Sequence, residues 1–386
     1  MKLTQVEKTK LRTWVELDRA AIAKNYQTFK SIIPKDCILM AVVKSNAYGH
    51  GLIEFSKEVV KCGVNFLGVD SFEEAQELRA VGIKTRIMVF GYVSPAYYKE
   101  ALKKNVSITI SNFEALHALK NIKGIKIHIK VDTGLGRQGF LMSDMKRVIE
   151  FLRKNKGVIV EGLYSHLAVG EASEGREYTM LQAERLELWE REFNINGFTP
   201  LLHICASSST MFFPELHYDM VRVGIGMYGL WSSSETKEAF ENKYTLHPVL
   251  SWKAIITEIK SLPKGAEIGY DLTEKLKRNS VLGVVPVGYW HGYPRLLSSK
   301  GVFNVAGKTV KIIGRVSMDM IVIDLTDVRA KVGDEVAIIG GDHGHYAEAD
   351  MMAQDSDTIN YEIVTRINPI IKRFYRINPL VKRIIN

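Results

Sequence analysis

The first part of the chain alternates short apolar runs with segments of helical periodicity. Each run suits one buried strand, and each segment between runs is long enough for a helix that returns the chain for the next strand. The runs cover residues 37–43, 64–69, 85–90, 106–110, 125–131, 158–165, 200–205 and 220–225. These eight strand-helix units predict a closed (β/α)8 barrel, the TIM-barrel form of the α/β class.

Helix-boundary residues lie between these runs. The segments 71–74 (Ser-Phe-Glu-Glu) and 111–114 (Ser-Asn-Phe-Glu) have the spacing of capping boxes, which predicts helices that begin at Ser71 and Ser111. Gly82 and Gly157 lie where helices are expected to end. The segments between the apolar runs are therefore predicted to be helical.

After about Phe240 the pattern changes to short alternating runs, at residues 252–259, 281–289, 302–313, 320–325 and 335–339. Turn sequences at 263–265 and 331–334 separate some of them, which is typical of a β domain. We therefore predict a barrel domain over residues 11–245 and a C-terminal all-β domain over residues 246–386. A helix is expected at residues 358–367, ended by Asn368-Pro369.

Composition and charge narrow the class of protein. With 386 residues and 46% hydrophobic content, the chain can bury a large core. Cys37, Cys62 and Cys205 lack paired spacing, which predicts a reducing compartment, and residues 1–12 are polar, so neither export nor membrane spanning is expected. These features predict a cytoplasmic protein.

The net charge of +9 is scattered along the chain, with its densest parts at residues 371–376 and 381–383. A scattered excess indicates a solvated face or attraction for small anionic substrates rather than a nucleic-acid site. We therefore expect neither nucleic acid nor a membrane as a partner.

Polar residues collect where the predicted barrel strands end, which is where barrel enzymes place their active sites. The set comprises Lys44, Lys130, Asp132, Arg137, His166, His203, Ser207 to Ser209, Arg222 and Gly224. A lysine at a strand end can be an ordinary surface residue, but when desolvated it becomes a nucleophile toward an aldehyde. Serine hydroxyls and glycine N–H groups near the last two strands suit a phosphate. Together these residues favour pyridoxal 5'-phosphate held as a Schiff base on Lys44.

Six segments resemble motifs of alanine racemases, in order along nearly the whole chain. They are residues 43–51 (VKSNAYGHG), 130–137 (KVDTGLGR), 221–229 (VRVGIGMYG), 288–295, 314–319 (GRVSMD) and 361–367 (YEIVTRI). The resemblance implies a pyridoxal-phosphate amino-acid racemase that interconverts L-alanine and D-alanine, and so supplies D-alanine for cell-wall peptidoglycan.

The resemblance also implies a role for each matching residue. Lys44 and Tyr270 would be the two catalytic bases on opposite faces of the substrate, with Tyr270 reaching the barrel of the other subunit of a homodimer. His166, held by Arg222, would support Tyr270, and Arg222 would face the pyridine nitrogen and leave it unprotonated.

The remaining implied contacts concern the phosphate and the substrate. Phosphate contacts would come from Tyr48, Ser208, the backbone of Gly224 and Ile225, and Tyr361. Substrate contacts and supporting residues would be Arg137 and the Met318 backbone at the substrate carboxylate, Asp319 and Tyr289 at the entrance, and Lys130, whose counterpart is carbamylated in several family members.

The sequence departs from the family pattern at Trp290 and His291, where alanine and an acidic residue are usual, and at Ser207, where asparagine is common. The first two changes concern the substrate entrance, so a racemase of serine or another small amino acid remains an alternative. A barrel-type decarboxylase and a non-catalytic pyridoxal-phosphate carrier are further alternatives. Residues 341–345 (GDHGH) are interpreted as a surface turn, and no metal is expected.

Overall fold

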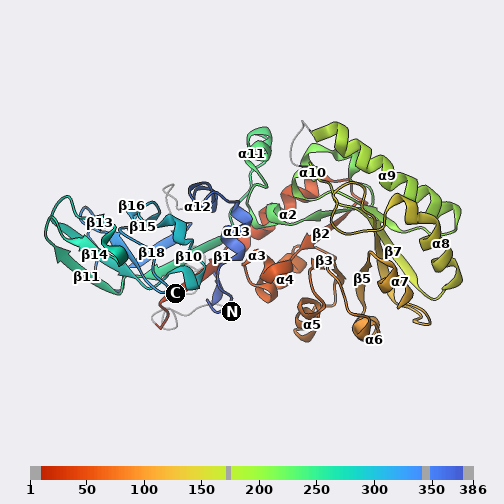
Figure 1. Cartoon of the computed structure of the whole chain (residues 1–386), viewed down its shortest axis with the longest axis horizontal. Coiled ribbons are helices and arrows are strands. Elements are labelled where there is room, and N and C mark those ends of the chain that lie inside the picture. Colours follow the sequence, from red (N-terminus) through yellow and green to blue (C-terminus); the bar gives the residue numbers. More distant parts are fainter. Residues whose placement is uncertain (1–9, 171–174, 341–347, 377–386) are drawn as a thin grey trace, which may run out of the picture. The chain divides into compact units, whose positions relative to one another are not determined.

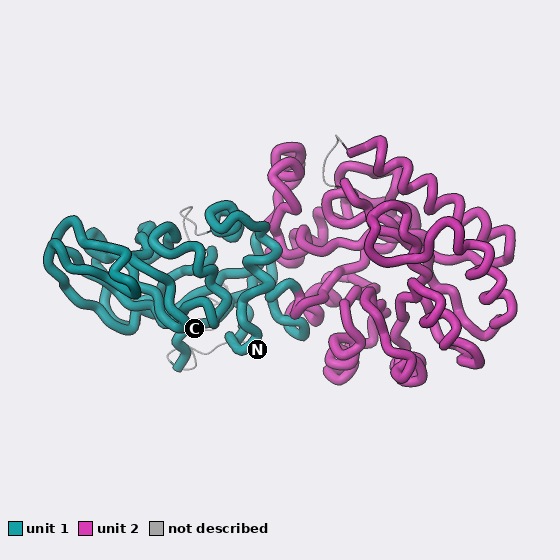
Figure 2. Tube along the Cα trace, viewed as in Figure 1, with its two compact units in different colours: residues 1–20, 48–54, 248–386 teal, residues 21–47, 55–247 magenta. Residues whose placement is uncertain are grey.

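The computed structural model describes residues 10–170, 175–340 and 348–376. Internal contacts divide the chain into two compact units, coloured separately in Figure 2. Unit 1 consists of Met1–Ala20, Tyr48–Glu54 and Pro248–Asn386, and unit 2 of Ala21–Ala47 and Phe55–His247. The later limit lies close to the predicted division at residue 245, whereas residues 1–20 and 48–54 belong with the C-terminal part of the chain.

Unit 2 is built on a sheet of eight parallel strands within the described residues, and helices surround the sheet (Figure 1). In chain order the strands are β2 (Ile38–Val42), β3 (Phe66–Val69), β4 (Arg86–Val89), β5 (Val106–Ile110), β6 (Lys126–Lys130), β7 (Ile159–Tyr164), β8 (Leu201–His203) and β9 (Met220–Val223). Every predicted barrel run contains one of these strands. The sheet nearly closes, because Asp219 N–H donates to Leu202 O (3.1 Å) and Arg222 N–H to Cys205 O (3.0 Å). The predicted (β/α)8 barrel is confirmed.

A helix follows each barrel strand, as the alternating pattern predicts. The helices are α2 (Arg19–Ile32), which precedes β2, and then α4 (Leu52–Lys61), α5 (Phe72–Ala80), α6 (Tyr98–Lys103), α7 (Phe113–His117), α8 (Met145–Lys154), α9 (Arg176–Ile195), α10 (Ser207–Phe212) and α11 (Ser234–Phe240). Inside the barrel, large side chains from five strands pack together and fill the interior, as closure requires: Met40, Phe66, Met88, Tyr164 and Met220.

One of the two predicted helix starts needs correction. Ser71 caps α5 and accepts from Glu74 N–H at 3.3 Å, as predicted. At α7 the cap is Asn112, whose side chain accepts from Ala115 N–H at 2.8 Å. Ser111 instead accepts a hydrogen bond from Gln138 (3.1 Å). Both residue types cap helices well, so sequence alone did not distinguish the two neighbours.

Unit 1 contains antiparallel sheets and two helices within its described residues. A six-stranded sheet has the order β16 (Lys308–Lys311), β15 (Val302–Val305), β18 (Glu335–Ile339), β10 (Leu250–Ile255), β1 (Thr13–Leu17) and β19 (Arg373–Tyr375), in which β1 and β19 are the one parallel pair. A second sheet contains β11 (Glu258–Leu262), β14 (Ser280–Val285) and β17 (Ile321–Asp324), and a short ladder joins β12 (Glu267–Ile268) to β13 (Glu274–Lys275). The helices are α12 (Ala349–Asp355) and α13 (Asn360–Thr365).

Three predicted runs in unit 1 had the wrong extent. Run 252–259 contains parts of β10 and β11, which belong to different sheets, and run 302–313 is the β15–β16 hairpin, whose turn is Ala306-Gly307 with positive φ at both residues. Run 281–289 leaves the strand after Val285. Apolar alternation continued through these bends, so periodicity alone did not show them. The predicted helix at 358–367 is present as the shorter α13.

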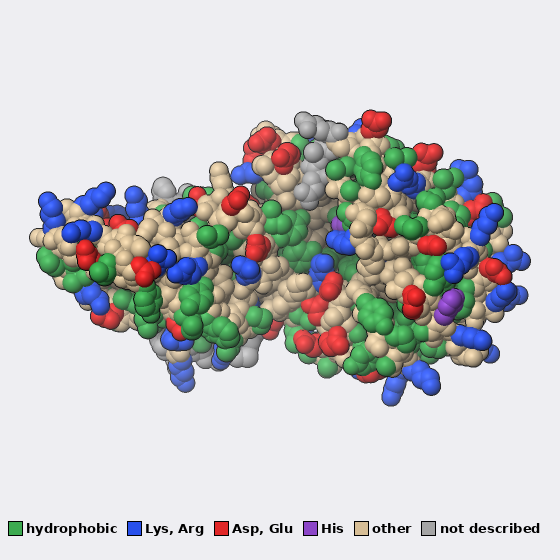
Figure 3. Space-filling view, viewed as in Figure 1, with side chains coloured by type: hydrophobic (Ala, Val, Ile, Leu, Met, Phe, Trp, Pro, Cys, Tyr) green, Lys and Arg blue, Asp and Glu red, His purple; other side chains and the backbone are tan. Residues whose placement is uncertain are grey.

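Charged residues of both signs alternate over the face of each unit that Figure 3 shows. No large single-sign patch appears on that face, which agrees with the predicted scattered charge. Within the described residues, no helix is long and apolar enough to cross a membrane. Cys37, Cys62 and Cys205 are free thiols.

Candidate active site

Polar side chains gather at the carboxyl ends of the barrel strands in unit 2. Lys44 follows β2, Lys130 ends β6, His166 follows β7 and Arg222 lies in β9. Lys44 is among the charges that, after burial, lower the pKa values of both Lys130 and His166. Lys130 Nζ and the Arg222 guanidinium lie 5.5 Å and 5.4 Å from the centre of the same Tyr164 ring, and Arg222 contacts His166 at 3.2 Å. The structure therefore brings together the barrel residues that the strand ends predicted.

Lys44 begins a left-handed turn, labelled α3 (Lys44–Tyr48). Ser45, Asn46 and Ala47 have φ values of 56°, 55° and 51°, a conformation that costs an L-residue about 1–2 kcal/mol. Tyr48 follows with φ of 50°, so four consecutive non-glycine residues have this conformation before Gly49, and the sequence did not predict it. This backbone conformation fixes the direction in which the chain leaves the lysine.

Two acidic residues that sequence reasoning missed hold this turn. Glu74 accepts from Asn46 N–H (3.1 Å) and from Asp70 N–H (2.9 Å). Asp70 in turn lies 3.6 Å from the Lys44 amine, and both side chains are partly exposed. Glu74 thus ties the turn after β2 to the end of β3. The only sequence signal for this role was the position of Glu74 in a capping box, whose usual backbone partner it does not use.

Arg222 is buried in the barrel and donates to four groups. Its guanidinium contacts His203 Nδ1 (2.8 Å), His166 Nδ1 (3.2 Å), Ser165 O (2.9 Å) and Ile204 O (2.8 Å). Burial lowers its pKa to about 10, so it remains a cation at neutral pH. The predicted contact between His166 and Arg222 is present.

His166 is neutral at this position. Burial, followed by the charges of Arg222 and Arg137, lowers its pKa to about 3. Because Arg222 can only donate, Nδ1 of His166 accepts, and the ring proton lies on Nε2. His166 therefore presents an N–H donor on the side of the ring away from Arg222.

Lys130 is buried at the end of β6 and donates to Gln138 Oε1 at 3.1 Å. Burial lowers its pKa to about 8, and the charges of Arg137, Arg222 and Lys44 contribute. The loop that carries Arg137 is shaped by Asp132, whose carboxylate accepts four backbone N–H groups, those of residues 134 to 137, at 2.9–3.1 Å. Burial raises the pKa of Asp132, but these four bonds outweigh it and lower the pKa below its usual value.

The serine turn after β8 differs in detail from the predicted phosphate site. Ser207 Oγ accepts from Gly224 N–H (3.0 Å) and Gly226 N–H (3.3 Å), and Ser208 Oγ donates to Gly170 O (3.0 Å). The Gly224 N–H is thus engaged by Ser207, the residue that departs from the family pattern. A phosphate contact from Gly224 requires this bond to be shared or replaced. Ile225 begins the 3₁₀ turn that follows.

A cavity of about 600 Å³ lies beside this rim within unit 2. Arg137, His166 and Ser208 line it together with apolar residues such as Leu135 and Leu167. Its volume is in the usual range for small-molecule sites, and its polar groups are those predicted for the site.

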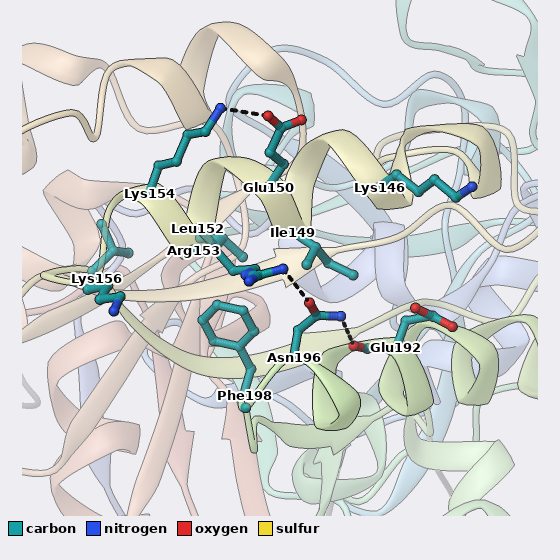
Figure 4. A pocket seen from close by; sticks show the side chains of 12 residues that line it. Lys146, Ile149, Glu150, Leu152, Arg153, Lys154, Lys156, Glu192, Asn196 and Phe198 are labelled. Atoms are coloured by element: carbon teal, nitrogen blue, oxygen red, sulfur yellow. Dashed lines mark hydrogen bonds and ion pairs between the residues drawn. The ribbon is translucent and has the colours of Figure 1, made fainter.

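A second cavity, of about 740 Å³, lies at the other end of the barrel (Figure 4). Its lining comes from α8, the end of α9 and the loops that lead into β7 and β8, and includes Lys146, Arg153, Asn196 and Phe198. This is the amino end of the strands, where barrel enzymes do not place their chemistry.

In unit 1, Tyr48 and Tyr361 lie side by side, with ring centroids 6.0 Å apart. Gly49 makes this approach possible, because a Cβ at that position would lie 1.8 Å from Val364 O in α13, and its φ is +80°. The two predicted phosphate-binding tyrosines therefore form a pair on one side of α13.

Tyr270 is 68% exposed at the start of a 3₁₀ turn in unit 1. The next residue, Asp271, has φ of 60° and forms an ion pair with Arg315 at 3.0 Å, which fixes the turn. An exposed tyrosine on a fixed turn is available to a second protein chain.

The predicted entrance residues also lie together in unit 1. Tyr289 N–H donates to Ser317 O and Trp290 N–H to Met318 O, each at 3.0 Å. Asp319 lies 3.9 Å from His291 Nδ1. His291 is buried and accepts from Gly288 N–H (3.2 Å), so this departure from the family pattern supports the loop from inside rather than altering the exposed surface.

No group of three or more His, Cys, Asp or Glu side chains suited to a metal occurs in the described part of the chain. The predicted surface turn at residues 341–345 lies outside the described residues.

The chain combines a (β/α)8 barrel with a β unit. A lysine follows the first barrel strand and a buried arginine lies in the last one, and this combination is typical of a class of two-domain barrel enzymes. Residues 17–232 match the family described as alanine racemase, N-terminal domain, and residues 249–375 match alanine racemase, C-terminal domain. The chain belongs to the alanine racemase family.

Similar proteins of known sequence and structure agree with this assignment. The alanine racemase of Leptospira interrogans is 37% identical over 94% of this chain and 95% of its own length, and that of Symbiobacterium thermophilum is 38% identical over 94% and 97%. The structure of alanine racemase from Bacillus anthracis with bound L-Ala-P has a TM-score of 0.88 at 34% identity, covering 95% of each chain. Alanine racemase from Streptomyces lavendulae has a TM-score of 0.88 at 32% identity, covering 96% of this chain and 98% of that one.

Proposed function

We propose that this chain interconverts L-alanine and D-alanine with pyridoxal 5'-phosphate bound covalently at Lys44. The observation that carries the proposal is the group of donors at the barrel rim. Lys44, Lys130, Arg137 and Arg222 bring cationic groups to one space, beside a cavity of about 600 Å³. A phosphate and a substrate carboxylate are both anions, so the donor set fits this cofactor and an amino acid.

When bound, pyridoxal phosphate withdraws electrons from Cα of the amino acid and makes its proton removable. Lys44 binds the cofactor and moves the Cα proton on one face. Tyr270 of the partner subunit holds the proton on the opposite face, and the Nε2–H of His166 stabilises its deprotonated oxygen. Arg222 would face the pyridine nitrogen and, because it is always a cation, would leave that nitrogen unprotonated.

The other contacts orient the substrate and the phosphate. Arg137 and the Met318 backbone bind the carboxylate, and Tyr289 and Asp319 shape the entrance. The phosphate would be held by the pair Tyr48 and Tyr361, by Ser208, and by the backbone of Gly224 and Ile225, with the Gly224 N–H shared with or released from Ser207. The active form is a homodimer in the cytoplasm, and its D-alanine is used for peptidoglycan.

Incubation of the purified protein and pyridoxal phosphate with individual L-amino acids tests this function. We expect D-alanine to form from L-alanine faster than D-serine forms from L-serine, measured by chiral chromatography. The control is the Lys44→Arg variant, which retains the positive charge but lacks the reactive amine. Faster racemisation of serine, or no racemisation of either, would contradict the proposal.

Tyr270→Phe is expected to reduce racemisation about a hundredfold to ten-thousandfold, the usual contribution of a general base. The loss should be asymmetric, because each base removes the proton from one enantiomer. Exchange of the Cα proton in deuterated water measures the two directions separately, and Tyr97→Phe serves as a control. Equal, unreduced exchange from both enantiomers would exclude Tyr270 as a base.

Lys130 is expected to carry a carbamate when carbon dioxide is present. Only the neutral amine reacts with carbon dioxide, and with a pKa of about 8 its neutral fraction rises as pH increases through that value. A carbamate would also place a negative charge among the cations Arg137, Arg222 and Lys44 that lower this pKa. Carbon-13 NMR with labelled bicarbonate should show the signal at pH 8.5 and a weaker one at pH 6.5. Persistence of the signal in Lys130→Gln would assign it to another residue.

A further inference from the structure

A line of buried hydrogen bonds runs through the barrel from Arg222 toward the opposite end of the strands. Arg222 contacts His203 Nδ1 (2.8 Å), and His203 Nε2 contacts His128 Nδ1 (3.0 Å). His128 Nε2 contacts Glu161 Oε2 at 3.3 Å, and Ser107 Oγ donates to the same oxygen. The side chains come from β9, β8, β6, β7 and β5, so the line crosses the barrel core.

Both ends of the line fix the direction of every bond in it. An arginine only donates, so His203 Nδ1 accepts and its proton lies on Nε2. That proton is donated to His128 Nδ1, which places the proton of His128 on Nε2. The last bond then ends on the Glu161 carboxylate, which only accepts. One arrangement with two neutral imidazoles satisfies all four groups.

The surroundings are consistent with this charge distribution. Burial is the main cause that lowers the pKa values of His203 and His128, and Arg222 contributes to both. Burial raises the pKa of Glu161, but the hydrogen bond from His128 and the other contacts lower it overall to about 2. The line thus has a cation at one end and an anion at the other.

The barrel makes room for this line and holds its rings. A Cβ at position 162 would lie 2.0 Å from His128 Nδ1, so Gly162 leaves the space that the ring occupies. Tyr164 stacks on His203 with ring centroids 4.8 Å apart and planes 4° apart. Buried polar groups cost free energy unless they are fully paired, and here a small residue and a stacked ring keep them paired.

We propose that Glu161 is a positioning residue for Arg222, acting as its remote counter-charge through His128 and His203. Among the described residues no carboxylate forms an ion pair with Arg222 directly. The bond from Arg222 Nη1 to His203 fixes the orientation of the guanidinium, so that its remaining donors stay directed at the rim. The negative charge of Glu161 favours the cationic form of Arg222. This inference rests on the proposed role of Arg222 toward the pyridine nitrogen.

A purely structural role for Glu161 is the competing explanation. Its other oxygen lies 3.9 Å from Lys126, and Arg86 also acts on His128, so Glu161 could serve only that end of the barrel. Both explanations give the neutral Nε2–H tautomer in the two rings, because donation from Arg222 fixes His203 and, through it, His128. The two explanations differ in whether loss of the Glu161 charge changes the reaction at the rim. The imidazole state tests the hydrogen-bonded line itself, which the proposal requires.

Nitrogen-15 NMR of the histidine-labelled holoenzyme measures this state directly, with His128→Gln and His203→Gln used to assign the signals. We expect both imidazoles to be neutral Nε2–H tautomers that do not titrate between pH 6 and 9. A charged ring, or a proton on Nδ1 of either ring, would overturn the proposal. This measurement needs no substituted core carboxylate, so it can overturn the proposal even if the Glu161 variants do not fold.

Two substitutions then test the connection to Arg222. Glu161→Gln keeps an acceptor for His128 but removes the negative charge, so it should preserve both tautomers and lower kcat. Glu161→Leu removes the charge and the acceptor together and should lower kcat about tenfold with little change in KM, a loss that corresponds to about 1.4 kcal/mol. Glu150→Gln, at an exposed carboxylate of α8 paired with Lys154, is the control. An unchanged kcat in Glu161→Leu would refute the proposal.

The outcome also separates this inference from the proposed function. If the tautomers are as expected but the wild-type protein racemises no amino acid, the proposed function fails. If racemisation is normal but the tautomers differ, only the role of Glu161 fails.

Discussion

Lys44→Ala is expected to abolish racemisation and covalent retention of the cofactor together. Lys44 is the amine at the end of the first barrel strand, at the start of a left-handed turn that Glu74 holds. Its removal deletes the covalent anchor and one base, and the base alone contributes about a hundredfold to ten-thousandfold. Borohydride reduction followed by peptide mapping should place the cofactor on Lys44 in the wild-type protein.

Two further variants separate the amine from its charge. Lys44→Arg retains a cation near Asp70 but has no reactive amine, so it should be as inactive as Lys44→Ala. Lys84→Ala removes an exposed lysine elsewhere in unit 2 and should behave as wild type. If mapping finds the label on another lysine, or if Lys44→Arg remains active, the assignment of Lys44 is wrong.

Arg222→Glu is expected to slow racemisation about a hundredfold, which corresponds to about 3 kcal/mol of transition-state stabilisation. A carboxylic acid there favours protonation of the cofactor's pyridine nitrogen, which should produce a new long-wavelength absorption band and more transamination. The ratio of pyruvate to D-alanine formed measures that change. The pKa of His166 should also rise, because one of the charges that lower it is removed.

Arg222 also has a structural contribution that must be controlled. Its guanidinium satisfies Ser165 O and Ile204 O, so the glutamate variant should have a lower melting temperature. Arg222→Lys keeps the charge and should leave the pyruvate ratio near that of wild type. If Arg222→Glu binds the cofactor with an unchanged spectrum and ratio, the arginine is structural only.

The barrel and its rim could be predicted from the sequence because each strand is a separate apolar run with polar residues at its end. Lys44, Lys130 and Arg222 follow from that rule. The acidic residues that support these side chains could not be predicted from that rule. Glu74, Asp70 and Glu161 are ordinary acidic residues in sequence, and their roles depend on strands that are neighbours only in the closed barrel.

Strand β1 was missed for a related reason. Its sequence, TWVEL, is short and contains Glu16, which looks exposed in sequence. In the structure Glu16 is buried, bound by Trp14 Nε1 (3.0 Å) and Lys253 (3.1 Å). Its neighbours in the sheet are β10 and β19, and no local pattern in the sequence indicates pairing with strands so distant.

This pairing has a consequence for the order in which the chain can fold as it leaves the ribosome. β1 is synthesised near the start, but its partners are residues 250–254 and 373–375. At about 5–20 residues per second, β10 follows β1 by roughly 10–50 s. During that time the barrel strands can pair with one another, while Trp14, Val15 and Leu17 have no sheet to join. The first of the described strands to be made is therefore among the last of them to pair, and loss of the last few described residues would leave one of its edges open.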